Sequence, residues 1–440
     1  MQQYFSDLAD YVMRNVRGDE VVLVTFDAEQ SDFVRFSRST VRQAGSVSQR
    51  YLWLDLIRGQ RHASSYTALA GDAATDRKRA DALIGELRER LPHVPEDPYL
   101  LYSTEVRSTE RSGDNRLPDR DAALDAIMQA GDGRDLVGIY AQGGIFSGFA
   151  NSLGQRNWFS SYSFNFDWSF YHRDDKAVKT SYAGFSWDSA QFARKVQTAA
   201  EQLSILARPA KTVQPGQYRV YLAPAALSEF VGLLGWGGFS IKAHRTKSTP
   251  LLRMIEANAL LSPMVTIREN TRDGIAPNFE SAGFIKPDAV VLIENGRSRE
   301  TLVSPRSARE YGVQPNGASG GESPDSLDMD GGDVPHDDIL KRLDTGMFIN
   351  QLWYLNFSDR PACRITGMTR FASFWVENGR IEAPLAVMRF DETSYRVLGD
   401  NLLCLTRERD FMPDPHTYEA RSTSSARMPG AIVDKFMFTL

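Results

Sequence analysis

The fold class depends on one stretch, YRVYLAPAALSEFVGLLGWGGF (residues 218–239). From Tyr221 to Phe239 it is apolar apart from Ser228 and Glu229, and its length is close to the roughly 20 residues that a membrane-spanning helix needs. A proline near its start and several glycines in its second half would interrupt such a helix. We therefore expect a strand that leads into a glycine-rich helix, buried in the core of a soluble protein.

A proline-containing segment, residues 207–217, precedes this stretch and has the composition of a linker. The chain has 440 residues, a length typical of two or three domains. We place the main domain boundary at the linker. Residues 1–208 are predicted to form an α+β N-terminal domain, and residues 209–440 a β-rich C-terminal domain around the glycine-rich central helix. The predicted fold class is therefore α+β.

Periodicity predicts most of the elements in the N-terminal half. Where apolar residues recur at intervals of three and four, we expect a helix, and where β-forming residues cluster, we expect a strand. The predicted helices lie near residues 4–12, 76–91, 119–130 and 188–206, and the predicted strands at 21–26 and 50–56. Residues 93–117 are rich in proline, serine and charge, and we expect a solvated connection there.

One strand of the N-terminal half has a strict alternation. Its large aromatic residues point to one side, and its polar residues point to the other; the aromatic residues are Phe164, Phe166, Trp168 and Phe170. The pattern predicts a half-buried antiparallel strand. Its aromatic face is expected to pack on the core, and the alternative is a strand that lines a substrate groove.

The C-terminal half carries the same tetrapeptide twice, Glu-Asn-Gly-Arg, at residues 294–297 and 377–380. Each copy follows an apolar run, Val290–Ile293 or Phe374–Val376. Asn-Gly between apolar runs is a strong signal of a β-hairpin, because both residues tolerate a positive φ. Two such hairpins predict a substantial antiparallel sheet.

Residues 317–338 are polar and read as a long acidic loop. Part of this loop has an imperfect EF-hand spacing, formed by Ser326, Asp328, Asp330, Gly331 and Asp337. Serine at the first position, aspartate in place of glutamate at the last, and the lack of a preceding helix weaken a calcium site. The competing interpretation, a solvated acidic loop, is favoured.

Composition excludes several classes of function. The net charge is -5, and the basic residues are dispersed, so neither a nucleic-acid-binding nor a membrane-binding surface is indicated. The two cysteines, Cys363 and Cys404, cannot build a disulfide framework. The N-terminus does not have the pattern of a secretory signal. These features together predict a cytoplasmic protein.

No motif for independent catalysis is apparent. None of the six histidines is spaced for a helix-borne zinc site, and no G-x-S-x-G elbow is present. A basic segment, Lys242–Arg253, directly follows the glycine-rich stretch. It could bind a peptide carboxylate or an acidic partner, although a solvated basic turn is the more common outcome for such a run.

Several segments together resemble the TldD/PmbA family, whose members have been described as modulators of DNA gyrase. The similar segments are Arg35–Ser39, Asn151–Gly154, Val220–Pro224, Asp344–Ile349 and ITGMTRFASFWVENG at residues 365–379. The last of these carries the strongest resemblance, and the similarity is weak between Gln43 and Arg120. The family fold implied is an α+β N-terminal domain followed by a β-rich C-terminal domain.

The catalytic branch of this family carries H-E-x-x-x-H on the central helix and a late cysteine as a further metal ligand. Matching places Gly232, Leu233 and Gly237 at the motif positions, and the region 419–429 has no cysteine. The resemblance is therefore to the TldE/PmbA branch. It implies a metal-free partner of a zinc-bearing, TldD-like catalytic subunit, with unfolded or leader peptides as substrates and no cofactor in this chain.

By this resemblance we expect substrate contacts from five residues around the central helix and the hallmark segment: Trp236, Phe239, His244, Arg245 and Arg370. The chain could also pair with itself in isolation. Two alternatives remain. One is a stand-alone peptide-binding or scaffolding protein, and the other is an enzyme of repurposed chemistry using His244, Asp337 and His416.

Overall fold

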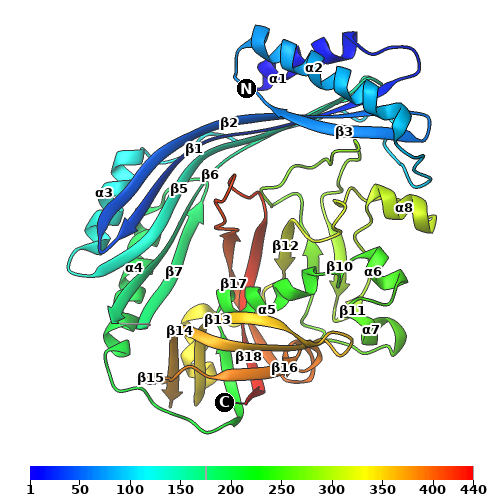
Figure 1. Cartoon of the computed structure of the whole chain (residues 1–440). Coiled ribbons are helices and arrows are strands. Elements are labelled where there is room, and N and C mark those ends of the chain that lie inside the picture. The colour runs from blue at the N-terminus through cyan, green and yellow to red at the C-terminus, as the bar shows by residue number, and fades with distance from the viewer. Residues whose placement is uncertain (174–175, 440) are drawn as a thin grey trace.

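A computed structural model describes residues 1–173 and 176–439. Two β-sheets face one another, and the polypeptide passes once from the N-terminal sheet to the C-terminal sheet (Figure 1). The N-terminal sheet has seven strands in the order β3-β2-β1-β5-β6-β4, with β7 paired to β6. These strands are β1 (Val21–Ser37), β2 (Thr40–Arg58), β3 (Arg61–Ala68), β4 (Thr109–Ser112), β5 (Asp135–Asn151), β6 (Arg156–Arg173) and β7 (Lys176–Gly184).

Four helices accompany this sheet (Figure 1). They are α1 (Gln2–Arg14), α2 (Ala73–Arg90), α3 (Arg120–Gly131) and α4 (Ser189–Leu206). The last three begin at aspartates, Asp72, Asp119 and Asp188, whose side chains accept hydrogen bonds from backbone N–H groups of the first turn. The predicted helices are confirmed to within a few residues. The connection over residues 93–117 is less open than predicted, because it contains β4 and the short η1 (Leu91–His93) precedes it.

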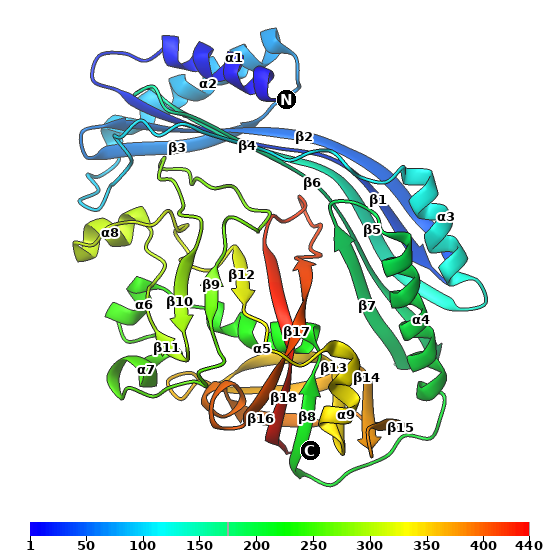
Figure 2. The ribbon, with the colours of Figure 1, turned by 180° about the vertical axis from the view of Figure 1, so that it is seen from behind.

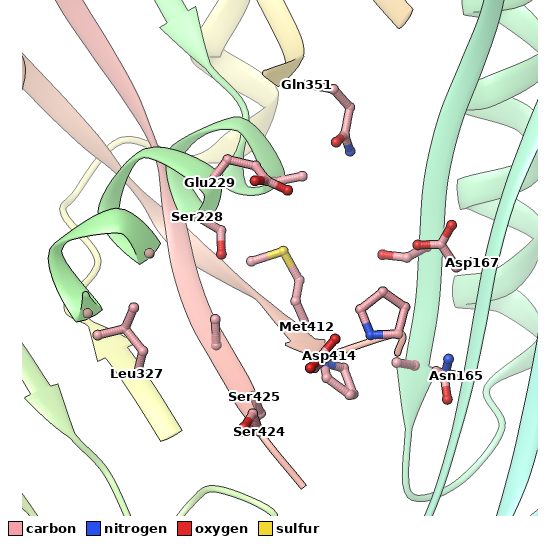
Figure 3. Close-up of a pocket in the computed structure, with 18 of the residues that line it drawn as sticks. Asn165, Asp167, Ser228, Glu229, Leu327, Gln351, Met412, Asp414, Ser424 and Ser425 are labelled. Carbon is pink, nitrogen blue, oxygen red and sulfur yellow. The ribbon is translucent and has the colours of Figure 1, made fainter. Parts of the chain in front are cut away.

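Strand β6 has two different faces. Its four alternating aromatic side chains are each at most 1% exposed, and they pack with Phe192 of α4 in one cluster. The opposite face carries Asn165 and Asp167 and is directed toward the C-terminal half (Figure 3). The predicted core face is confirmed, and the strand lines a cavity with its other face.

The C-terminal sheet has eleven strands, in the order β11-β10-β9-β12-β18-β16-β14-β13-β8, with β15 paired to β14 and β17 paired to β18. The strands are β8 (Gly216–Leu222), β9 (Ile267–Glu269), β10 (Val290–Glu294), β11 (Arg297–Ser298), β12 (Ser326–Met329), β13 (Gly346–Asp359), β14 (Arg364–Glu377), β15 (Arg380–Pro384), β16 (Arg389–Thr393), β17 (Leu402–Pro413) and β18 (Ser425–Phe438). Both predicted hairpins are confirmed: Asn295 and Gly296 have φ of 48° and 75°, and Asn378 and Gly379 have φ of 52° and 73°.

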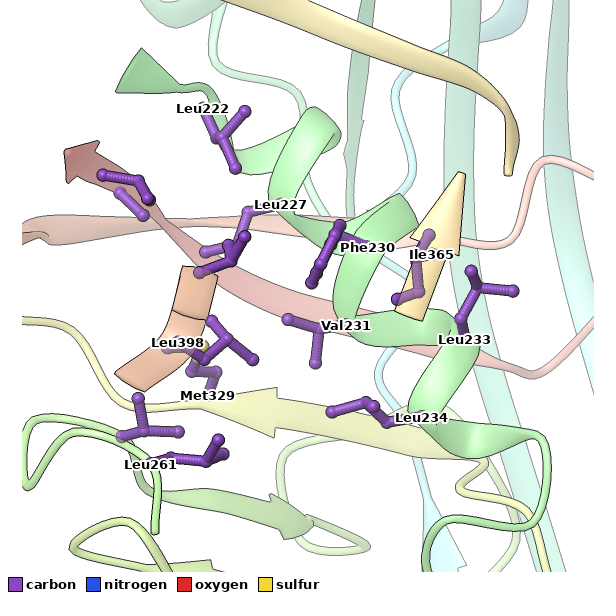
Figure 4. Packing of buried hydrophobic residues seen from close by; sticks show 14 of the residues in the cluster. Leu222, Leu227, Phe230, Val231, Leu233, Leu234, Leu261, Met329, Ile365 and Leu398 are labelled. Atoms are coloured by element: carbon purple, nitrogen blue, oxygen red, sulfur yellow. The ribbon is translucent and has the colours of Figure 1, made fainter. Parts of the chain in front are cut away.

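The central stretch forms β8, then α5 (Pro224–Gly232), then the short η2 (Leu233–Gly235), as predicted. Leu227, Phe230 and Val231 are fully buried and fill the core of the C-terminal half (Figure 4). Within residues 1–173 and 176–439, no helix is both long and apolar enough to cross a membrane. The remaining short helices are α6 (Ile241–Arg245), α7 (Leu252–Glu256), α8 (Pro305–Tyr311), η3 (His336–Asp338), α9 (Ile339–Leu343) and η4 (Arg396–Asp400).

The interpretation of residues 317–338 as a solvated loop is wrong. Residues 326–329 form β12, which lies between β9 and β18 inside the sheet. Asp328 is 3% exposed and bonds Arg409 and Asn270. In an extended segment Ser326, Asp328 and Asp330 share one face at intervals of about 6.6 Å, so they cannot wrap around one ion as the ligands of a curled EF-hand loop do. The spacing arises from the strand and its arginine partners.

The neighbouring strand β9 holds a carboxyl group that makes stability depend on pH. Glu269 is 5% exposed and accepts a hydrogen bond from Ser326 N at 2.9 Å. Burial raises the pKa of Glu269 to about 7, with Asp325 raising it further and Lys286 opposing the shift. Because the folded-state pKa lies above the unfolded value, this stabilising contribution is complete below the unfolded pKa and is lost as the pH rises through about 7.

We therefore expect the melting temperature to fall between about pH 4.5 and pH 7, with a loss of about 3 kcal/mol from this residue. Replacing Glu269 with Gln removes its ionisation and should make the profile shallower in that interval, while Glu280, whose pKa burial also raises to about 7, keeps part of the slope. Thermal unfolding followed by circular dichroism across this range measures both profiles. Parallel profiles for the wild-type protein and Glu269→Gln would contradict the assignment.

Candidate functional site

A cavity of about 490 Å³ lies between the two sheets, and we call it the central cavity. Strands β6 and β7 form one wall, and α5 with the segment joining β17 to β18 forms the other (Figures 2 and 3). Polar and charged side chains from both halves of the chain line it: Asn165, Asp167, Lys179, Ser228, Glu229, Gln351 and Asp414. The cavity is therefore built from segments that are up to 261 residues apart in sequence, since Asn165 and Ala426 both line it.

Lys179 is the cation that acts on two carboxylates of this cavity, those of Asp167 and Glu229. Lys179 of β7 lies 3.5 Å from Asp167 of β6, measured from Nζ to Oδ1. Burial raises the pKa of Asp167, and the charge of Lys179 opposes that shift. Glu229 on α5 also lines the cavity. Burial raises the pKa of Glu229, and the positive charge of Lys179 opposes that shift. Neither carboxylate is fully compensated by a cation.

Two further polar groups of the cavity come from elements that only the fold brings together. Asn165 is 7% exposed, faces the cavity, and its side chain has no hydrogen bond with any residue that the structure describes (Figure 3). Ser228 lies one position before Glu229 on α5 and also lines the cavity. In the sequence, Ser228 and Glu229 stand out because they interrupt an otherwise apolar run, and this signal could have identified them.

Of the residues predicted to bind substrate, Trp236 lines the central cavity and is 57% exposed. Phe239 is 1% exposed within the C-terminal core, so the structure assigns it to packing. His244 Nε2 lies 2.6 Å from Gly238 O, and burial lowers its pKa. Arg245 is exposed on α6. Arg370 covers the ring of Trp353 at 4.4 Å and does not line the cavity.

The residues proposed for repurposed chemistry are not brought together. His244 belongs to α6, and Asp337 belongs to η3. His416 lines a second cavity of about 560 Å³, which contains neither of them. In the basic segment, Lys247 pairs with Glu256 at 2.6 Å and Arg253 covers the ring of Tyr395, which agrees with a solvated turn that is partly neutralised.

The motif positions on the central helix carry no metal-binding side chain. Gly232 lies at the end of α5 on the cavity wall, Leu233 is 6% exposed in the core, and Gly237 has φ +87° close to Arg360. Across residues 1–173 and 176–439, no three side chains of histidine, cysteine, aspartate or glutamate are grouped to hold a metal ion. The residues present therefore do not fit the zinc site of a metallopeptidase.

Nucleophilic chemistry is equally unsupported by the cysteines. Cys363 and Cys404 are both buried. Burial raises the pKa of Cys363 to about 11, and it also raises the pKa of Cys404. A thiol of this kind stays protonated at neutral pH and is a poor nucleophile. The two cysteines therefore supply no activated nucleophile.

Comparison with known proteins defines the class to which this fold and site belong. A family model described as the PmbA/TldA metallopeptidase C-terminal domain matches residues 215–440, which is more than half of the chain. The chain belongs to the PmbA/TldD family of metallopeptidase-related proteins, and its sequence contains no H-E-x-x-x-H pattern. No curated protein sequence matches it significantly.

Solved structures share the fold over the whole chain. TldE from Thermococcus kodakarensis superposes with a TM-score of 0.78 at 13% identity, covering 99% of this chain and 100% of the other. A protein assigned as a modulator of a DNA gyrase from Thermotoga maritima gives 0.75 at 16% identity, covering 99% of both chains. A protein assigned as a modulator of DNA gyrase from Bacteroides thetaiotaomicron gives 0.71 at 18% identity, covering 99% and 98%. At these identities the likeness shows the fold.

Proposed function

We propose that this chain is a non-catalytic, TldE-like subunit of a cytoplasmic two-chain peptidase. A TldD-like subunit supplies the zinc ion and the cleavage chemistry, and this chain helps to enclose and hold the peptide. The substrates are unfolded or leader peptides. Membership of a metallopeptidase-related family and a likeness to TldE along nearly the whole of both chains support this role.

One observation carries the proposal: the end of α5 offers Gly232 to the cavity, followed by a buried Leu233, where the catalytic branch has its metal ligands. Hydrolysis of an amide at neutral pH requires an activated nucleophile and stabilisation of the developing charge. A protein-bound zinc ion supplies both in metallopeptidases. Glycine and leucine side chains can neither coordinate zinc nor accept a proton, so this chain needs a second polypeptide for cleavage.

The test is reconstitution with a TldD-like chain that carries H-E-x-x-x-H. Each chain is purified alone, and hydrolysis of an unstructured peptide is measured for each chain and for the equimolar mixture. We expect no cleavage by this chain alone, chelator-sensitive cleavage by the mixture, and co-elution of the two chains in size-exclusion chromatography. Metal analysis should place the zinc in the partner.

Two results would count against this role. Chelator-sensitive cleavage by this chain alone would show that it holds a catalytic metal itself. A lack of both co-elution and added activity, combined with peptide binding by this chain, would instead favour a stand-alone peptide-binding protein.

A further inference from the structure

We propose that the central cavity binds a cationic side chain, that of lysine or arginine, from the peptide. This inference rests on the proposed role of the chain in holding a peptide, and it specifies which peptides the chain prefers. Three observations support it: the charge balance of the cavity wall, the unpartnered Asn165 and the apolar surface beside the carboxylates. In addition, acidic side chains and purely apolar side chains would be less stable in this cavity.

The charge balance of the cavity wall is negative. Among the described residues that line the cavity, Asp167, Glu229 and Asp414 carry carboxylates, and Lys179 is the single cation. Lys179 lies 3.5 Å from Asp167. Glu229 has no ion pair within 4.0 Å to a described residue. A second cation in the cavity would therefore neutralise the carboxylate of Glu229, which has no cationic partner among the described residues.

Asn165 provides an independent sign that the cavity is built for a ligand. Its side chain is 7% exposed, and its amide faces the cavity without a hydrogen-bond partner among the described residues. The polar atoms of this amide open onto the cavity, so a ligand there can pair with them. The amide oxygen can accept a hydrogen bond from an ammonium or guanidinium group held by Asp167, two positions along the same face of β6.

The remaining wall suits the stem of such a side chain. Trp236, Leu327 and Met412 line the cavity with apolar surface. Trp236 is 57% exposed, so its ring is accessible to a bound side chain. Lysine and arginine carry an aliphatic stem behind the charged head, so one side chain can cover apolar surface and reach carboxylates at once. An aromatic ring near the cation adds a further attraction.

Other groups fit less well. An acidic side chain would add a negative charge to a site with more carboxylates than cations, and like charges at close range are strongly unfavourable. A purely apolar side chain would remove water from Glu229 and Asp167 without replacing its hydrogen bonds. The cationic side chain is the one class that satisfies the carboxylates, Asn165 and the apolar wall together.

The experiment uses the full chain alone and three fluorescent peptides that differ at one central position: lysine, norleucine or glutamate. All three are acetylated at the N-terminus and amidated at the C-terminus, so the central side chain carries the only difference in charge. Fluorescence anisotropy measures the dissociation constants. We expect the lysine peptide to bind at least about fivefold more tightly than the norleucine peptide, and the glutamate peptide to bind most weakly.

Variants assign the preference to the cavity. Asp167→Asn and Glu229→Gln should each weaken binding of the lysine peptide by about 5–20-fold and leave the norleucine peptide unchanged. Glu382→Gln is the matched control, because Glu382 is exposed on β15 and lies outside the cavity. Asn165→Asp adds a carboxylate at the unpartnered position and should tighten binding of the lysine peptide. Thermal unfolding confirms that each variant is folded.

Three outcomes would overturn the inference. They are equal binding of the lysine and norleucine peptides, equal losses for both peptides in the cavity variants, and no binding of any peptide up to about 1 mM. A norleucine peptide with a free N-terminus that binds as tightly as the lysine peptide would overturn the assignment to a side chain. The assay needs no catalytic partner. Lysine selectivity without activation of a TldD-like chain would therefore refute only the proposed function, and activation without selectivity would refute only this inference.

Discussion

Replacing Asp328 with alanine will lower the free energy of unfolding by about 2–4 kcal/mol, because the substitution removes the counter-charge that three partly buried arginines share. Asp328 lies on β12 and is 3% exposed. Arg409 donates a hydrogen bond to it, and Asn270 Nδ2 donates another at 2.9 Å. Arg268 and Arg427 lie 3.8 Å and 3.9 Å from its carboxylate oxygens.

Three guanidinium groups thus converge on one carboxylate, and each comes from a different strand: β9, β17 and β18. Without Asp328 these cations would repel one another in a partly dehydrated environment. The loss should therefore exceed that of an ordinary surface ion pair, which contributes about 0–1 kcal/mol. Asp328→Asn keeps the shape of the side chain and should lose less than Asp328→Ala.

Denaturation by guanidinium chloride measures the change, and Asp330→Asn is the control. Asp330 also pairs with Arg268, through an Nη2–Oδ2 distance of 2.7 Å, but its side chain is 42% exposed. We expect about 0.5–1 kcal/mol from that control. A loss below about 1 kcal/mol for Asp328→Ala would show that the arginine cluster is solvated and that Asp328 does not hold β9, β12, β17 and β18 together.

The same residue explains where prediction from sequence reaches its limit. Local signals were sufficient for the central stretch, for the aromatic alternation of β6 and for both Asn-Gly hairpins, since each depends on neighbours in sequence. Strand β12 is four residues long, and an aspartate stands in its interior. Asp328 is tolerated there because arginines from distant parts of the chain neutralise it, and those partners are invisible in a local pattern.

The candidate site shows the same limit. Trp236 was predicted because it adjoins the central helix, and it lines the cavity. Asp167 and Asn165 belong to the polar face of a strand whose aromatic face was the more evident feature. Their approach to Glu229 depends on how the two sheets face one another, which is a property of the whole fold. The polar interruption at Ser228 and Glu229 was the one local sign of this site.

Replacing Arg421 with alanine should lower the free energy of unfolding by about 3–5 kcal/mol and loosen the segment between β17 and β18. Arg421 is 8% exposed, although it lies in a connecting segment. Its guanidinium donates to Ser163 O at 3.0 Å, to Ser163 Oγ at 2.8 Å and to Gly143 O at 3.3 Å. These acceptors belong to β5 and β6, so one side chain from the C-terminal half joins two strands of the N-terminal sheet.

A buried carboxylate holds the backbone of Arg421 and lies near enough to favour its positive charge. Glu29 is 4% exposed, and its Oε2 accepts a hydrogen bond from Arg421 N at 3.2 Å. Burial lowers the pKa of Arg421 to about 10, with Glu29 opposing the shift, so the group remains protonated at neutral pH. Alanine would keep the backbone hydrogen bond to Glu29, but it would leave Ser163 and the Gly143 carbonyl without the guanidinium donor and remove the positive charge near Glu29. Lysine would keep the charge but cannot bond Ser163 and Gly143 through one planar group.

Chemical denaturation and hydrogen exchange of residues 414–424 measure the two effects. Arg407→Ala is the control, because Arg407 is exposed on β17 and should contribute less than about 1 kcal/mol. Asp414 and Ser424 line the central cavity, and His416 and Tyr418 line the second cavity. Since Arg421 fixes the segment that separates the two cavities, Arg421→Ala should raise exchange across residues 414–424 and leave exchange in α1 unchanged. Unaltered exchange in the segment would contradict this role for Arg421. It would mean that other contacts hold the segment against the N-terminal sheet, such as the hydrogen bond from Gln49 Nε2 to Glu419 O at 2.7 Å.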